Sequence, residues 1–300
     1  MPLAFDLVRI SVIEFGVGRE TDNGVEFVII PTDEDIKTAL QDMVSETVKA
    51  LSKHDEVVFA PAEKYDSQEN IVTATNGEYA GILADLHRSQ MLPILANALS
   101  EPEHIVCYFA RLLSGDGRRL TCVRRATQFK GILKSRLIQV VTDALKIVEE
   151  QTFKLDNDYD FLIDDENIHI LRAVGFVALA GIEGVVMAAV PQNIARLQEH
   201  LPFVDFTSIS TYAATHSRAA KVLASICSEG EASDVSKERF MAACSECGAE
   251  VQIVADHVRP RAGHELNFLY VLDRRLFRVQ LVEGRIERYQ AGSRRPIQSA

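Results

Sequence analysis

Three aspartates stand at alternate positions in the segment DNDYD, and this spacing resembles the start of a calcium-binding loop. Asp156, Asp158 and Asp160 would supply the oxygen ligands that calcium prefers. The loop also requires Gly at its sixth position and Glu at its twelfth, where this chain has Phe161 and Asn167. We therefore expect a polar turn that leads into the strand FLID, and no calcium site.

The same acidic region leaves a second chemistry open. Asp158, Asp160 and Asp164 lie near Lys154 in the sequence. Scattered carboxylates and a lysine can assemble the metal site of a nuclease without a strong local signature. A metal-dependent nuclease is therefore the alternative to the function argued below.

Cys244 and Cys247 form a CxxC pair, but structural zinc needs four ligands, usually supplied by two such pairs. Cys227, His257 and His264 are too irregularly spaced to complete the set. We expect the pair to end a helix with one thiol turned inward, and we predict no metal and no cofactor. The N-terminal segment MPLAFDLVRISVIEF alternates apolar and polar residues, unlike a signal peptide, so we expect a cytoplasmic protein with free thiols.

Other catalytic signatures are incomplete or missing. The segment GHEL at 263–266 begins like the helix of a zinc protease, but Phe268 occupies the position of its second histidine. The chain has no Gly-x-Ser-x-Gly elbow, no Walker loop and no GxGxxG after a predicted strand. We expect a protein without catalytic residues.

Basic residues are concentrated in two segments. Eight lie between 111 and 136 against one acid, and nine arginines lie between 257 and 300 against four acids. The segments have net charges of +7 and +5 in a chain of −11, which leaves about −23 for the remainder. Segregation of this size is typical of an electrostatic binding surface, and the planar fork of Arg suits phosphate. Pairing with the chain's own carboxylates, or with an acidic protein partner, stays open.

We predict a phosphate-contacting surface from these two segments. In the first, Arg118 and Arg124 alternate with Arg119 and Arg125 along a strand, a pattern that favours an exposed edge or tip. In the second, Arg278 faces away from the apolar side of its strand, whereas Arg274 and Arg275 follow Asp273 and one of them is expected to pair with it. The predicted contacts are Arg118, Arg119, Arg124, Arg125, Lys130, Lys134, Arg274, Arg275 and Arg278.

These side chains must be positioned by mixed helices and strands. The first 60 residues predict a strand, the turn TDNG, a strand, a helix capped by Thr32, and the short buried strand EVVFAP. Helical segments are expected around 77–88 and 89–99. Gly-Asp-Gly at 115–117 predicts a hairpin.

The second half predicts short strands and then helices. Residues 136–172 contain several short strands, with Asp-Asp-Glu-Asn as a hairpin tip, and 176–247 is helical, with Ser236 as one cap. HELNFLYVL predicts a buried helix, and LFRVQLV and RIERY predict strands. We expect an α+β fold with an N-terminal αβ region at 1–132 and a second region at 133–300.

The most apolar stretch, residues 173–190, contains Glu183 and three glycines. A carboxylate at the centre of a bilayer costs roughly 3 kcal/mol. We therefore expect a buried segment here, and any membrane association would come through a partner.

Several long segments resemble the KwaB family, the soluble component of the bacterial Kiwa anti-phage defence system. They are FKLDNDYDFLIDDENIHILR, LPFVDFTSI, SRAAKVLASI and GHELNFLYVLDRRLFRVQLVEGRIERYQAGSRR, in this order. The resemblance is best over roughly 150–295. It implies DNA binding without an established catalytic site, suppression of phage DNA replication and late transcription, and action with the integral-membrane partner KwaA at the inner membrane.

The sequence and the resemblance together predict an anti-phage defence protein that binds DNA without chemistry and largely without sequence preference. Its expected partners are phage DNA, KwaA and a second copy of the chain, since a homodimer would lengthen a basic track. The expected location is cytoplasmic, with recruitment to the inner membrane through the partner. A pure assembly module without a nucleic-acid role is a third possibility.

Overall fold

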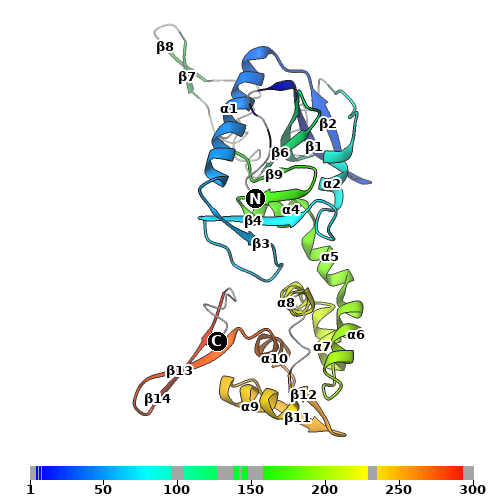
Figure 1. Cartoon of the computed structure of the whole chain (residues 1–300), viewed down its shortest axis with the longest axis vertical. Helices are drawn as coiled ribbons and strands as arrows, with labels where there is room; N and C mark the ends of the chain where they lie inside the picture. The colour runs from blue at the N-terminus through cyan, green and yellow to red at the C-terminus, as the bar shows by residue number, and fades with distance from the viewer. Residues whose placement is uncertain are drawn as a thin grey trace. The chain divides into compact units, whose positions relative to one another are not determined.

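Contacts divide the chain into two compact units (Figure 1). Unit 1 comprises Met1–Val58 and Asp66–Gly181, and unit 2 comprises Phe59–Tyr65 and Ile182–Ala300. The computed structural model describes residues 5, 7, 9–95, 104–126, 138–141, 144–147, 158–228 and 235–292. The predicted boundary at 132/133 lies outside the described residues. Both units mix helices and strands, which confirms the α+β class.

Unit 1 contains an eight-stranded sheet in the order β2-β1-β5-β6-β9-β10-β4-β3. Neighbouring strands are antiparallel except β3 and β4, which are parallel. Its strands are β1 (Ile10–Thr21), β2 (Gly24–Ile30), β3 (Asp55–Val58), β4 (Glu69–Ala74), β5 (Ile105–Ser114), β6 (Arg119–Arg125), β9 (Phe161–Ile163) and β10 (Asn167–Ile170). A separate hairpin joins β7 (Ile138–Val141) and β8 (Ala144–Ile147).

Three predicted turns are confirmed. Thr21 pairs with Gly24 at the end of the β1–β2 hairpin, where Gly24 has φ +110°. Gly-Asp-Gly joins β5 to β6, and Gly117 there has φ +86°, a conformation that favours glycine. The Asp-Asp-Glu-Asn turn joins β9 to β10, with the Asp164 carboxylate accepting hydrogen bonds from the backbone N–H groups of Glu166 and Asn167.

Helices cover both faces of the sheet. On one face, α1 (Glu34–Leu51) buries Leu40 and Val44 in a core with Phe15, Tyr108 and other sheet residues. On the other face, α2 (Gly81–Arg88) places His87 3.0 Å from the Thr121 hydroxyl, and α4 (Ala173–Leu179) packs its Phe176 ring 5.6 Å from that of Phe161.

Three local predictions in this unit are wrong. Asp33, not Thr32, caps α1, because its carboxylate accepts the Ile36 N–H at 2.9 Å. The strand at 55–58 is not buried, since β3 is the last strand of the sheet and Val58 is 82 % exposed. Residues 89–95 form no helix, and the backbone there pairs with β2 through Ile94 and Ile29.

The arginine-bearing strand β6 is also not an exposed edge, which corrects the prediction for 119–125. It pairs with β5 on one side and β9 on the other. Leu120 and Cys122 enter the α1 core, while Thr121 faces α2 on the opposite side. All four residues from Leu120 to Val123 are fully buried. Solvent therefore reaches only the two ends of the strand and its hairpin tip.

Unit 2 is built around α8, against which α5, α6, α7 and α10 pack (Figure 1). Small residues such as Ala219 and Ala220 are fully buried on α8 and allow this close approach. The helices are α5 (Ile182–Ala188), α6 (Val190–His200), α7 (Thr207–Ala213), α8 (Ser217–Ser228), α9 (Lys237–Cys247) and α10 (Glu265–Leu272). Two hairpins complete the unit, β11 (Val251–Val254) with β12 (His257–Pro260), and β13 (Leu276–Val282) with β14 (Arg285–Gln290).

Several predictions for this unit are confirmed. Ser236 caps α9, which ends at Cys247, and Cys244 is buried while Cys247 is half-buried. The helix α10 is buried from Phe268 to Leu272. Residues 173–190, which run from the end of unit 1 into unit 2, were expected to form a buried segment, and they are buried only in part, since Val174 is 75 % exposed. They form no single long helix, because the chain breaks at Gly181 with φ +62°. Within the described ranges, no helix is both long and apolar enough to span a membrane.

Candidate functional site

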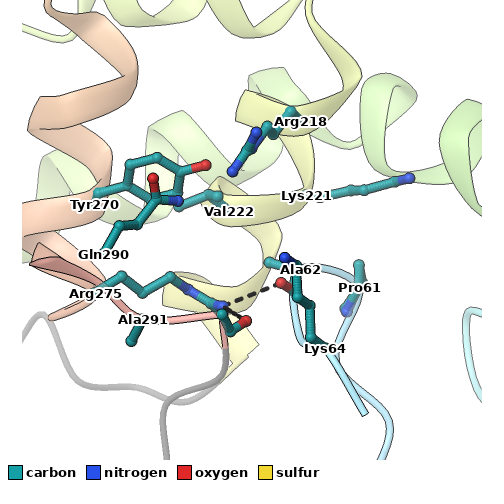
Figure 2. Close-up of a pocket in the computed structure, with 11 residues that line it drawn as sticks. Pro61, Ala62, Lys64, Arg218, Lys221, Val222, Tyr270, Arg275, Gln290 and Ala291 are labelled. Atoms are coloured by element: carbon teal, nitrogen blue, oxygen red, sulfur yellow. Dashed lines mark hydrogen bonds between the residues drawn. The ribbon is translucent and has the colours of Figure 1, made fainter. Parts of the chain in front are cut away.

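A basic pocket of about 350 Å³ lies within unit 2 (Figure 2). Four segments build it: the loop 59–65, the helix α8, the helix α10 with Arg275 just after it, and the end of β14 with the two residues that follow. Its lining residues are Pro61, Ala62, Lys64, Arg218, Lys221, Val222, Tyr270, Arg275, Gln290, Ala291 and Gly292.

Arg275 holds the walls of this pocket together. The buried guanidinium pairs with Asp273 and with Glu63, both mostly or fully buried. It also donates to the carbonyl oxygens of Ala62 at 3.1 Å and Gly292 at 2.8 Å. Figure 2 shows the bond to Ala62. Its charge is thus offset by two carboxylates, and its structural role is to fasten the loop 59–65 to the segment after β14.

The remaining cations of the pocket are less compensated. Within the part of the chain that the structure describes, neither Lys64 nor Arg218 has an ion-pair partner. Lys221 reaches the Glu183 carboxylate only at 3.9 Å. Arg218 instead lies over the Tyr270 ring, 5.5 Å from its centroid, and Figure 2 shows the two side chains next to each other. A cation over a ring face is attracted by its negative quadrupole, which orients the guanidinium.

Tyr270 carries the second signal for a ligand. The residue is 3 % exposed, and its buried hydroxyl oxygen has no hydrogen-bond partner. Buried hydroxyls are nearly always hydrogen-bonded in native proteins. A phenol donor, a guanidinium fork and a lysine amine line one hollow, beside the Gln290 amide, which carries both a donor and an acceptor. This arrangement suits the oxygen atoms of a phosphate group.

The predicted arginines of the β5–β6 hairpin are mostly engaged within unit 1. Arg119 donates to the carbonyls of His87 at 2.6 Å and Ser89 at 2.8 Å, at the C-terminal end of α2. Arg124 pairs with Asp158 at 2.9 Å and with Asp160 at 3.3 Å. Arg118 lies at the exposed tip and pairs with Asp116 at 3.0 Å. Arg125 is half-buried at the end of β6.

The predicted C-terminal arginines have different roles. Arg275 is the expected partner of Asp273, which confirms that one of the pair is structural. Arg274 is exposed, in a left-handed turn with φ +54°. Arg278 is exposed, as predicted for its strand, and lies 3.6 Å from Glu246. Lys130 and Lys134 lie outside the described residues.

The model of the family described as Kiwa protein KwaB-like matches residues 105–279, more than half of the chain. This chain belongs to the Kiwa protein KwaB-like family. Membership indicates a component of a Kiwa anti-phage defence system. No curated protein and no solved structure matches the chain.

The KwaB-like match includes much of the basic pocket. Arg218, Lys221, Tyr270 and Arg275 fall inside it, whereas Lys64 precedes it and Gln290 follows it. Sequence reasoning missed every one of these pocket residues except Arg275. The available signal was the segment SRAAKVLASI, which places two basic side chains one helical turn apart next to small buried residues.

The carboxylates considered for a nuclease are engaged with basic side chains. Asp158 and Asp160 both pair with Arg124 and Arg172. Burial raises the pKa of Asp160, although the Arg125 N–H and the two arginines oppose this. Burial alone would also raise the pKa of Asp164, but hydrogen bonds from His169 and two backbone N–H groups bring it below its usual value.

The three carboxylates are thus already paired with basic side chains of the protein itself, Asp158 and Asp160 with arginines and Asp164 with His169. Among the described residues, no group of three or more His, Cys, Asp or Glu side chains is placed to hold a metal ion. Lys154 lies outside the described residues.

Proposed function

We propose that the protein acts in anti-phage defence by binding DNA without chemistry, with the basic pocket of unit 2 as a principal phosphate contact. One observation supports this most directly: Lys64, Arg218 and Tyr270 line the same pocket. The two cations lack carboxylate partners in the described chain, and the Tyr270 hydroxyl has no hydrogen-bond partner. Phosphate contacts supply most of the affinity of non-specific DNA binding.

The arginines predicted from charge have unequal parts in this proposal. Arg119, Arg124 and Arg275 position elements of the protein itself. Arg118, Arg125, Arg274 and Arg278 lie at exposed or half-exposed positions and serve as additional contacts. Weak surface pairs such as Arg118 with Asp116 are readily exchanged for phosphate, because exposed ion pairs contribute only about 0–1 kcal/mol.

We further propose that the protein acts with the integral-membrane partner KwaA and as a homodimer. Family membership supports action within a Kiwa system. Pairing two copies would double the phosphate contacts available to one DNA molecule, which raises the total affinity without a new site.

The test is a gel-shift assay with purified protein, duplex DNA and magnesium. Lys64→Glu combined with Arg218→Glu is expected to weaken binding by roughly tenfold or more, since each lost phosphate contact is worth on the order of 1 kcal/mol. Lys37→Glu combined with Lys49→Glu, on the surface of α1, removes the same charge and is expected to change affinity little.

Three outcomes separate the possible functions. Retarded, intact DNA that depends on the pocket supports the proposal. Cleaved DNA would instead establish a nuclease, and unretarded DNA would leave an assembly module.

A further inference from the structure

We propose that the basic pocket is specific for a phosphomonoester, the terminal phosphate of a nucleotide. The nucleotide is either free or the 5′ end of a DNA strand. This inference rests on the proposed function only in treating the pocket as a phosphate contact.

The size of the pocket limits what can enter it. A cavity of about 350 Å³ lies at the small end of the range for ligand sites. A DNA duplex, whose major groove alone is about 12 Å wide, can pass its backbone across the mouth of the pocket, where Lys64 and Arg218 are exposed, but cannot place that continuous backbone inside the hollow. One nucleotide unit can enter, and a strand end or a free nucleotide presents such a unit.

The charge of the pocket favours a terminal phosphate over an internal one. An internal phosphodiester carries one negative charge, whereas a phosphomonoester carries about −1.5 to −2 near neutral pH. Arg275 is already offset by Asp273 and Glu63. Lys64 and Arg218 therefore supply two positive charges that lack ion-pair partners in the described chain, whereas Figure 2 shows the Lys221 side chain extending away from Arg218 and Tyr270. This balance matches a dianion.

The hydrogen-bond donors are preorganised for the same group. The Tyr270 hydroxyl is buried without an acceptor, and Arg218 is held over the Tyr270 ring. A terminal phosphate offers three oxygens, so it can accept from the phenol and from both arms of the guanidinium together. An internal phosphodiester has two free oxygens and cannot satisfy the full set of donors as well.

The experiment compares single-stranded oligonucleotides of one sequence that carry either a 5′-phosphate or a 5′-hydroxyl, in competition for the wild-type protein. The 5′-phosphate form is expected to bind about tenfold more tightly. Tyr270→Phe removes only the orphan hydroxyl, and Arg218→Gln removes the fork; each is expected to abolish most of this preference. Lys49→Gln, on the surface of α1 and outside the pocket, removes an equal charge and is expected to preserve it.

Calorimetry with a nucleoside monophosphate and with the matching nucleoside shows whether the phosphate that the pocket binds belongs to a free nucleotide or to the 5′ end of a DNA strand. Binding of the monophosphate alone, lost in Tyr270→Phe, assigns the pocket to free nucleotides as well as strand ends. Binding of only the 5′-phosphorylated strand assigns it to DNA ends. Both results support a phosphomonoester site.

Equal affinity for the two oligonucleotides, together with no binding of the monophosphate, would overturn the inference. So would a 5′-phosphate preference that survives in both pocket variants. Closed circular duplex DNA, which has no ends, separates this failure from that of the proposed function. If circular DNA still binds through Lys64 and Arg218, DNA binding stands and only the terminal specificity is lost.

Discussion

Arg275 and Arg218 carry the same guanidinium group but meet different surroundings in one pocket. Arg275 is 2 % exposed and pairs with Asp273, which is fully buried, and with Glu63. Arg218 is exposed and rests on an aromatic ring. Charge counting treats these residues alike, yet one fastens the walls of the pocket and the other is available to a ligand. The function of each arginine follows from its partners.

Replacing Arg275 with Met is expected to destabilise unit 2 by roughly 3–5 kcal/mol, because the buried Asp273 carboxylate loses its counter-charge. Arg278→Met, at an exposed position, is the matched control and is expected to change the free energy of unfolding by no more than about 0.5 kcal/mol. Urea denaturation followed by circular dichroism measures both. Equal midpoints for the two variants would show that Arg275 is not structural.

The sequence predicted only part of this site. The pairing of Asp273 with a following arginine was predictable, because the residues are adjacent and follow a buried helix. The pocket was not, because Lys64 comes from a loop far from α8 in sequence, and only the tertiary fold brings it near Arg218. The orphan hydroxyl of Tyr270 has no sequence signal, since every partner that it lacks is defined in three dimensions.

At the scale of elements, local patterns predicted turns well and strand neighbours poorly. Gly-Asp-Gly and Asp-Asp-Glu-Asn specify tight turns through backbone conformations and side-chain acceptors, and both hairpins form. Arginines at both ends of β6 suggested an exposed edge, but β9 pairs with its other side. Pairing between strands distant in sequence is set by the packing of the whole sheet, which the alternation of one strand does not reveal.

The junction of α2 with β6 predicts a pH-dependent stability. Burial lowers the pKa of His87, and although Asp165 at 3.3 Å opposes this, the net shift is downward. Nearby Arg119 adds to the lowering, and Asp164 opposes it. As pH falls below about 6.5, the ordinary pKa of histidine, His87 is protonated in the unfolded chain but remains neutral in the folded protein. Stability is therefore lost on acidification, until His87 is also protonated in the folded state.

We expect the free energy of unfolding of unit 1 to fall by up to about 1.4 kcal/mol per pH unit below pH 6.5 because of this one group. His87→Gln is expected to flatten this part of the pH profile, whereas His216→Gln, at an exposed position, is expected to preserve it. Thermal melts at pH 5.5, 6.5 and 7.5 make the comparison. A wild-type profile that is flat over this range would contradict the assignment.

At the scale of the whole molecule, the distribution of charge matters more than its total. A net charge of −11 repels nucleic acid at long range, so binding must come from local concentrations of uncompensated cations. The structure reduces the number of cations that are available to DNA, because carboxylates of the protein itself pair with Arg124, Arg172 and Arg275. The pocket cations and the exposed arginines then determine how many phosphates are neutralised.

The number of DNA phosphates that the protein neutralises is measurable from the salt dependence of its DNA affinity. Each neutralised phosphate of duplex DNA releases counterions, so the logarithm of the affinity should fall linearly with the logarithm of salt, by about 0.9 per phosphate. Reversing the charges of Lys64 and Arg218 together is expected to reduce the slope by about 1.8, whereas reversing those of Lys37 and Lys49 on α1 should leave it unchanged.

Phage and random sequences should give the same slope, because backbone contacts carry no sequence information. Fluorescence anisotropy between 50 and about 200 mM salt, the range over which such contacts weaken strongly, provides the test. A flat response, or a slope that the pocket variant shares with the wild-type protein, would show that these cations do not contact the phosphates of DNA.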